Sequence, residues 1–318
     1  MAQGFPCFPG QLQGIFLQMQ DEYECMFFIA DWHSLTTHPT PENIRRSVKT
    51  ILSEYLACGI DPEKAPIYVQ SDVKPILELY LYLNMNAYLG ELERVTSFKE
   101  KARTQPNNVN AGLLTYPTLM AADVLAHKAD KVPVGKDQEQ NMEMMRLFAR
   151  RFNRIYGIEF FKEPESFHFN AKAIKVPGLD GSGKMGKSEG NAIYLCDDEA
   201  TIRKKVMKAV TDAGPTQMNQ EKPEAIRNLF TLMEIVSEPS TYDYFNDQYN
   251  NMAIRYGDMK KQLAADINAF CAPIRERILE YQANDEFLQK VANMGAEKAC
   301  ASAQKTLEDV REIIGFHR

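Results

Sequence analysis

The sequence has no CxxC pair, no internal repeat and no apolar run of membrane-spanning length. Its six cysteines are scattered, which argues against zinc and iron–sulfur sites and fits a reducing compartment. The N-terminus lacks the charged segment and the long apolar core of a signal peptide. These absences predict a cytoplasmic protein without a membrane segment.

Positive charge is also in short supply. Lys and Arg number 37 against 43 Asp and Glu, a net charge of −6, so the overall charge does not indicate nucleic-acid binding. A nucleic acid would need a local basic patch. The cluster Arg203, Lys204, Lys205 and Lys208 is one candidate, although it fits the solvent-exposed side of a helix equally well. The 318 residues leave room for about two domains.

Short apolar runs and helical patterns alternate through the first 195 residues. Strands are expected at Cys25–Ala30, Pro66–Gln70, Lys131–Val134 and Ala192–Leu195. Helices are expected from Pro41 to Leu56 and at Pro75–Leu89, Pro117–Ala129 and Gln138–Tyr156. This alternation predicts an α/β fold with a parallel sheet and crossover helices.

The pattern changes after Leu195, where only helical periodicity is found. Helices are expected at Glu199–Val210, Glu224–Val236, Tyr242–Asn251, Tyr256–Phe270, Pro273–Gln282 and Glu286–Ile314. We therefore predict two domains, an α/β domain over residues 1–196 and an all-helical domain over 197–318.

The most distinctive stretch is Gly181–Asn191, GSGKMGKSEGN. Glycines let backbone N–H groups approach a ligand, and lysines supply charge for phosphate. Residues 181–188 fit the P-loop pattern GxxxxGK[ST], but that pattern requires a strand before it and a helix after it. A solvated turn without function is a second interpretation. The third takes Lys184–Ser188, KMGKS, as one phosphate-binding unit.

A second candidate site lies in Thr115–Gln138. On a helix beginning near Pro117, Tyr116, Met120 and Asp123 share one face. A phenol, a thioether and a carboxylate there would suit an aromatic ligand with an N–H donor. Periodicity alone equally allows a core tyrosine and methionine beside an exposed aspartate.

Three further groups each have a functional and an ordinary interpretation. The turn at Gly135, Lys136 and Asp137, between a strand and a helix, fits a nucleotide contact or a plain βα turn. Lys99 and Lys101 offer two cations or a solvated helix face. Asp31 and His33 follow the first expected strand, at the sheet edge where α/β proteins bind ligands, or have a structural role.

Together these stretches resemble the bacterial tryptophanyl-tRNA synthetases, which are class I aminoacyl-tRNA synthetases. KMGKS is similar to the KMSKS signature of that class, with Gly186 in place of the first serine. The other similar stretches span Met19 to Arg318 and include FFIADWHSLTT, GELERVTSFKEKA, NAGLLTYPTLMAADVL, VPVGKDQEQNMEM and RYGDMKKQLAADI.

The resemblance implies a Rossmann-like catalytic domain, a helical anticodon-binding domain and a homodimer. It also implies a tryptophan–tRNA ligase. Tryptophan would attack the α-phosphate of Mg²⁺-bound ATP to give tryptophanyl-adenylate, and the terminal ribose of tRNA(Trp) would then accept the amino acid. Such transfers are catalysed mainly by positioning and charge stabilisation.

The resemblance also implies roles for single residues. Asp123 would accept the indole N–H. The tryptophan pocket would further include Tyr116, Met120, Gln138, Val132, Val134 and His33. ATP would be held by Gly135, Lys136, Asp137, Lys184, Met185, Gly186, Lys187 and Ser188. The catalytic cations would be Lys184, Lys187 and Lys101.

Residues 1–20 contain neither the HIGH-like tetrapeptide of the family nor a counterpart of its first strand. The HIGH-like segment contacts ATP in the family. A catalytically impaired or non-catalytic paralogue that binds tRNA or the amino acid is therefore the alternative. Such a chain would bind tryptophan better than it makes adenylate.

Overall fold

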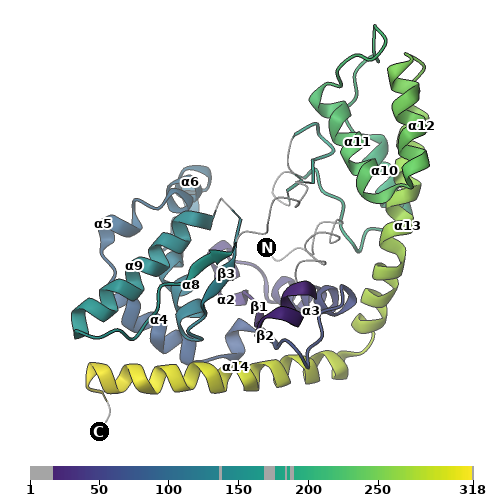
Figure 1. The fold of residues 1–318 in the computed structure, drawn as a ribbon. Coiled ribbons are helices and arrows are strands. Elements are labelled where there is room, and N and C mark those ends of the chain that lie inside the picture. Colours follow the sequence, from purple (N-terminus) through teal and green to yellow (C-terminus); the bar gives the residue numbers. More distant parts are fainter. Residues whose placement is uncertain (1–16, 136–137, 168–175, 183–184, 187–189, 317–318) are drawn as a thin grey trace.

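The computed structural model describes residues 17–135, 138–167, 176–182, 185–186 and 190–316. The expectation that residues 1–20 lack a HIGH-like segment and a first strand falls mostly on residues 1–16, which lie outside the described residues. Figure 1 shows an α/β part that rests on one long helix and a helical arm that rises from the end of that helix. The α/β fold with a following helical part is as expected.

The described strands form two parallel pairs. β1 (Phe27–Ile29) pairs with β2 (Ile67–Val69), with Ile29 opposite Val69. β3 (Lys131–Pro133) pairs with β4 (Glu165–Phe167), a strand that the sequence analysis missed. All three observed counterparts of the expected strands are shorter than expected. The parallel pairing places the ends of β1 and β2 side by side, which positions the site.

Helices cover these strands. The longer ones in the α/β part are α3 (Pro41–Ala57), α4 (Pro75–Met85), α6 (Thr96–Thr104), α8 (Tyr116–Leu125) and α9 (Glu139–Tyr156). Short helical segments are α2 (Asp31–Ser34), α5 (Leu89–Leu92) and α7 (Ala111–Leu114), with 3-10 turns at Leu35–Thr37, Gln70–Asp72 and Pro106–Asn108. α4 packs against α8, and α8 against α9. The core here is built from buried residues of β2, α4, α8 and α9.

Helices are the regular elements among the described residues after Asp198, and loops such as residues 208–223 connect them. Its helices are α10 (Glu199–Met207), α11 (Glu224–Val236), α12 (Pro239–Asn250), α13 (Tyr256–Gln282) and α14 (Asp285–Ile314). α11 has the expected bounds. α13 is one helix where two were expected, with Pro273 inside it. Burial of Cys271, Ile274 and Ile278 in the core that α13 shares with α3 outweighs the hydrogen bond that Pro273 cannot donate.

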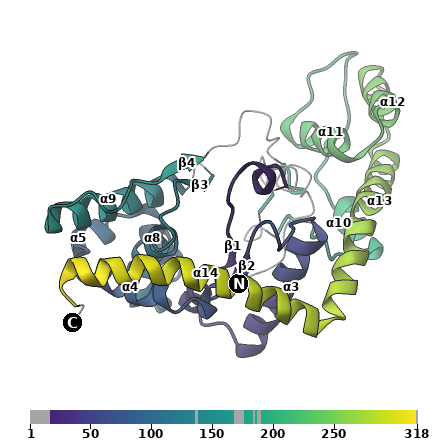
Figure 2. The same ribbon diagram turned by 60° about the horizontal axis from the view of Figure 1, so that its bottom comes forward.

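The long helix beneath the α/β part is α14, as a view from below also shows (Figure 2). It packs against β2, α4 and α3, and its Leu288, Val291 and Ala292 join the core around β1 and β2. The last helix of the chain is thus part of the α/β core. The domain boundary at residue 196 stays a prediction.

The strand expected at Ala192–Leu195 is wrong. Tyr194 forms only an isolated bridge, and a turn follows at Leu195. The Asp197 carboxylate accepts from the Tyr194 N–H at 2.8 Å, and the Tyr194 carbonyl accepts from the Asp197 N–H at 3.0 Å. This turn lets Ile193 and Leu195 enter the core shared with α10, α11 and α13.

Candidate active site

The carboxyl ends of β1 and β2 carry the first polar groups of the site. Gln70 comes directly after β2, and Asp31 follows β1 after Ala30, so the two residues meet at one sheet edge. The Asp31 carboxylate oxygen Oδ1 accepts from the backbone N–H groups of Trp32 and Ser71, each at 3.0 Å. Asp31 therefore ties the two strand ends together.

Asp123 lies on α8 at the centre of the site and is 3% exposed. Its Oδ2 is 2.9 Å from His33 Nε2, and its Oδ1 accepts from Gln70 Nε2 at 2.6 Å. Burial raises the pKa of Asp123, while the hydrogen bonds from His33 and Gln70 oppose that rise. The alternative of an exposed aspartate is wrong.

His33 has a second ring nitrogen without a partner. Its Nδ1 is buried and has no hydrogen bond among the described residues. Its ring packs on the Tyr116 ring, with centroids 4.3 Å apart. Buried polar atoms are nearly always satisfied in native proteins, so this nitrogen is available to a bound ligand or a water molecule.

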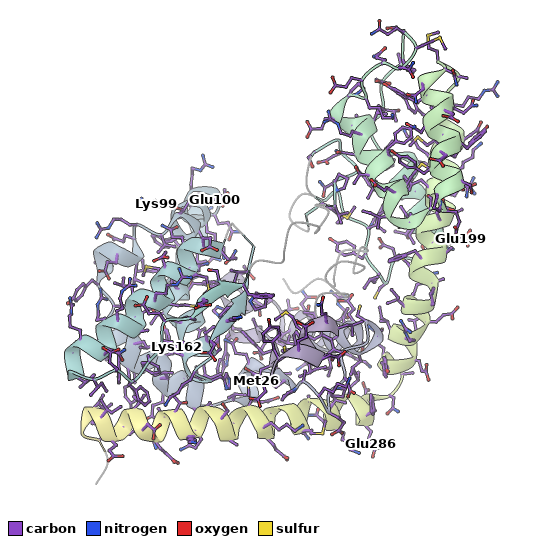
Figure 3. The ribbon with its side chains drawn as sticks, in the orientation of Figure 1. Met26, Lys99, Glu100, Lys162, Glu199 and Glu286 are labelled. Atoms are coloured by element: carbon purple, nitrogen blue, oxygen red, sulfur yellow. The ribbon has the colours of Figure 1, made fainter. Side chains whose placement is uncertain are left out.

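Tyr116 and Lys101 lie next to each other in the site. The Lys101 Nζ is 4.7 Å from the centroid of the Tyr116 ring. Burial lowers the pKa of Lys101 and raises that of Tyr116, and the Asp123 charge raises the Tyr116 pKa further. Lys101 is therefore a half-buried cation, whereas Lys99 is exposed on α6 beside Glu100 (Figure 3).

The apolar walls come from α8 and β3. Met120, Val132 and Val134 are partly buried and pack on the core that contains α8. Gln138 directly precedes α9, donates its backbone N–H to the Gly135 carbonyl at 2.9 Å and accepts from Asn141 Nδ2 at 2.8 Å. The predicted ATP contacts Lys136 and Asp137 lie outside the described residues.

The glycine-rich stretch is described only in part. Lys184, Lys187 and Ser188 lie outside the described residues. Met185 is buried, and the Gly186 N–H donates to Asn191 Oδ1 at 2.9 Å. Asn191 Nδ2 in turn donates to Asp180 Oδ1 at 2.9 Å, so this buried amide joins the two sides of the stretch.

The P-loop interpretation does not fit this geometry. A P-loop follows a strand and opens directly into a helix. Described residues 176–182 contain no strand, and residues 190–198 contain no helix before α10 begins at Glu199. The remaining interpretations of Lys184–Ser188 are the KMSKS-like unit and the plain turn.

Comparison with known proteins decides the family. The family profile described as tRNA synthetases class I (W and Y) matches residues 10–272. The chain belongs to this family of class I synthetases.

Two curated relatives and one solved structure are closely similar to this class I synthetase. A tryptophan–tRNA ligase of Porphyromonas gingivalis is 73% identical over 301 residues, which cover 95% of this chain and 92% of the relative. A tryptophan–tRNA ligase of Listeria monocytogenes is 40% identical over 307 residues, covering 95% and 91%. The tryptophanyl-tRNA synthetase of Campylobacter jejuni, crystallised with ADP and tryptophan, matches with a TM-score of 0.89 at 30% identity, covering 98% and 97%.

Two residues of the site carry no recognisable signal in the sequence of this synthetase. Gln70 was placed at the end of a strand but given no role, although it follows β2 as Asp31 follows β1. Asn191 was noted only as the last residue of the glycine-rich stretch. Within the described residues there is no cluster of three or more His, Cys, Asp or Glu side chains suited to a metal ion. None of the described helices is long and apolar enough to cross a membrane.

Proposed function

We propose that the chain is a tryptophan–tRNA ligase. It activates tryptophan with ATP to form tryptophanyl-adenylate and pyrophosphate, and it transfers the amino acid to tRNA(Trp). Its relatives of 73% and 40% identity carry this name. The observation that carries the proposal is the buried Asp123 carboxylate, which contacts His33 and Gln70 and shares α8 with the partly buried Met120.

Asp123 accepts the indole N–H of tryptophan. A buried carboxylate selects an aromatic ring with an N–H donor, because a ring acceptor that faces it is repelled and stays without a hydrogen bond. Met120, Val132 and Val134 form the walls around the indole. The α-ammonium and carboxylate of the amino acid lie toward the polar groups of the site, which are those of Tyr116, Gln138 and His33.

Three lysine side chains lie around the phosphates of ATP. Lys184 and Lys187 stabilise the charge that develops when the amino acid attacks the α-phosphate, and Lys101 acts on the pyrophosphate side. ATP is further held by Met185, Gly186 and Ser188 of the same loop and by Gly135, Lys136 and Asp137 of the turn after β3. Mg²⁺ enters with ATP, because Mg²⁺ usually takes its ligands from substrate phosphates and water.

Pyrophosphate exchange tests the function directly. The protein should exchange pyrophosphate into ATP only with tryptophan, and Asp123→Ala should raise the tryptophan KM by roughly 10- to 100-fold while leaving the ATP KM unchanged. An unchanged tryptophan KM would remove Asp123 from the pocket. Tryptophan binding without any exchange would favour the non-catalytic alternative.

A homodimer is the assembly that we propose. The α4 helix exposes Leu77, Leu81 and Met85, one turn apart, and Met85 is 77% exposed. The exposed Tyr88 and Leu89 continue this stripe toward α5. A contiguous apolar patch of this kind indicates a protein interface, and a two-fold dimer would bury it against its own copy. We place the enzyme in the cytoplasm, where tRNA is charged.

A further inference from the structure

Gln70 lies between the sheet edge and Asp123 and is fully buried. Its Oε1 accepts from the Trp32 backbone N–H at 3.1 Å, and its Nε2 donates to Asp123 Oδ1 at 2.6 Å. A backbone N–H can only donate, so the amide oxygen must face Trp32 and the amide nitrogen must face Asp123. The orientation of the Gln70 amide therefore follows from the main chain.

The backbone around Gln70 is itself held. Asp31 Oδ1 accepts from the N–H of Trp32, which Gln70 contacts, and from the N–H of Ser71, which follows Gln70. The parallel pairing of Ile29 with Val69 sets the two strand ends in register just before these residues. Gln70 thus presents its N–H to Asp123 from a rigid support.

A permanent donor at Oδ1 has a consequence for the ligand. The other oxygen, Oδ2, faces His33 Nε2 at 2.9 Å, so protein groups contact both oxygens of Asp123. These hydrogen bonds lower the pKa of Asp123 against the rise that burial causes, and an ionised carboxylate can only accept from a ligand. Such a site rejects an aromatic amino acid whose ring presents an acceptor in place of the N–H.

We infer that Gln70 is the positioning residue that makes Asp123 an obligate acceptor and thereby sets the preference for an indole N–H over a ring acceptor. This inference rests on the proposed role of Asp123 in tryptophan binding. Gln70 acts through Asp123 and not by contact with the reacting atoms. Its removal should therefore change selectivity for the ring and not the use of ATP.

The experiment compares tryptophan with 3-(benzofuran-3-yl)alanine, in which a ring oxygen replaces the N–H. Adenylate formation from both is measured by pyrophosphate exchange in the full chain and in Gln70→Met. The ratio of kcat/KM for tryptophan over the analogue should fall by roughly 10- to 100-fold, the equivalent of one hydrogen bond to a charged group. The ATP KM should stay within about twofold, because no ATP contact changes.

A second variant at Gln70 and a control variant at another amide complete the test. Gln70→Asn retains a buried amide but is one methylene too short to bridge Trp32 and Asp123, so it should lose selectivity even if Gln70→Met does not fold. Asn153→Leu is the matched control. Its amide also donates on one side, to the Phe161 carbonyl at 2.8 Å, and accepts on the other, from the Phe160 N–H at 3.1 Å. Loss of the Asn153 amide should lower stability without changing the ratio of kcat/KM for tryptophan over the analogue.

The Asp123→Ala variant distinguishes a failure of the proposed Asp123 role from a failure of the Gln70 inference alone. A ratio that is unchanged in Asp123→Ala would overturn the role of Asp123, and the Gln70 inference with it. A ratio that falls in Asp123→Ala but is unchanged in folded Gln70→Met and Gln70→Asn would overturn the role of Gln70 alone. An equal fall in Asn153→Leu would mean that the effect is merely structural.

Discussion

Gly295 of α14 lies directly against the main chain of Ile67 in β2. A Cβ at position 295 would be 2.0 Å from the Ile67 carbonyl oxygen and 2.6 Å from its carbonyl carbon. Only glycine allows this approach, because backbone atoms of a paired strand cannot move aside. The contact fixes α14 beneath β2, and Gln70 follows that strand directly.

Gly295→Ala should destabilise the protein. The methyl group forces α14 away from β2, with an expected cost of at least about 1–3 kcal/mol for overpacking. Thermal unfolding measures it, and Gly257→Ala is the control. A Cβ at position 257, near the start of α13, meets no atom within 4 Å, so that change should be neutral or slightly stabilising. Equal melting temperatures for both variants would contradict the close approach.

His127 should make stability fall in mild acid. Tyr68 OH and Ser302 Oγ each lie 3.1 Å from its ring nitrogens, and burial lowers its pKa to about 4. His127 binds a proton near pH 6.5 in the unfolded chain but only near pH 4 in the folded protein. The stability that its neutral form contributes above pH 6.5 is therefore lost as the pH falls. The slope is at most about 1.4 kcal/mol per pH unit.

Urea unfolding at pH 6.5 and pH 4.5 tests this. The wild-type midpoint should drop more than that of His127→Gln, which has no proton to gain at this position. His38→Asn changes an exposed histidine and should behave as wild type. Equal drops in the urea unfolding midpoint of His127→Gln and of wild type would show that carboxylates alone cause the acid dependence.

The ion pair of Arg151 with Glu91 should matter far more than surface pairs. Arg151 is 4% exposed, and its guanidinium donates to both Glu91 carboxylate oxygens at 2.7 Å and to the Asn86 carbonyl at 2.9 Å. Arg151→Leu should cost about 3 kcal/mol, because it leaves Glu91 partly buried and unpaired. The double change with Glu91→Leu should recover part of this in urea unfolding.

A surface pair provides the control. Lys162 and Asp130 form an ion pair at 2.5 Å, and their side chains are 70% and 66% exposed. Lys162→Ala should leave the unfolding midpoint unchanged. A loss equal to that of Arg151→Leu would mean that burial does not govern these pairs.

The two loop lysines should act on the rate more than on binding. Lys184→Ala and Lys187→Ala should each lower the rate constant of adenylation more than they raise the ATP KM, because the charge that the lysines stabilise develops chiefly in the transition state. Single-turnover kinetics separate the two quantities. Lys298→Ala, at an exposed position of α14, should alter neither. Pure KM effects at both loop positions would contradict the assignment.

The α4 stripe should control assembly. Met85→Glu should convert the proposed dimer into monomers, because it places a charge in the centre of an apolar interface. Analytical ultracentrifugation measures the mass, and Leu279→Glu on the exposed side of α13 is the control. Dimers of Met85→Glu as stable as wild type would exclude α4 from the interface, and monomeric wild type would remove the proposal.

Sequence patterns within single segments were sufficient to predict most helices and strands. The helix at Glu224–Val236 was predicted with its observed bounds, because its apolar periodicity ends where Ser237 begins an extended segment. Three strands were located because each is a short apolar run before polar residues. Asp123 and Met120 were assigned to one helix face by their spacing alone, and the shared face of α8 is observed.

Contacts between distant segments were beyond such signals. Gln70 reaches Asp123 across 53 positions, and this contact depends on how β2 and α8 pack. Pro273 stays inside α13 because that helix gains more from its core contacts than it loses at the proline. Ile193 and Leu195 form no strand because helices bury them. Periodicity reports which face of an element is apolar, whereas the partner of that face depends on the free energy of the whole chain.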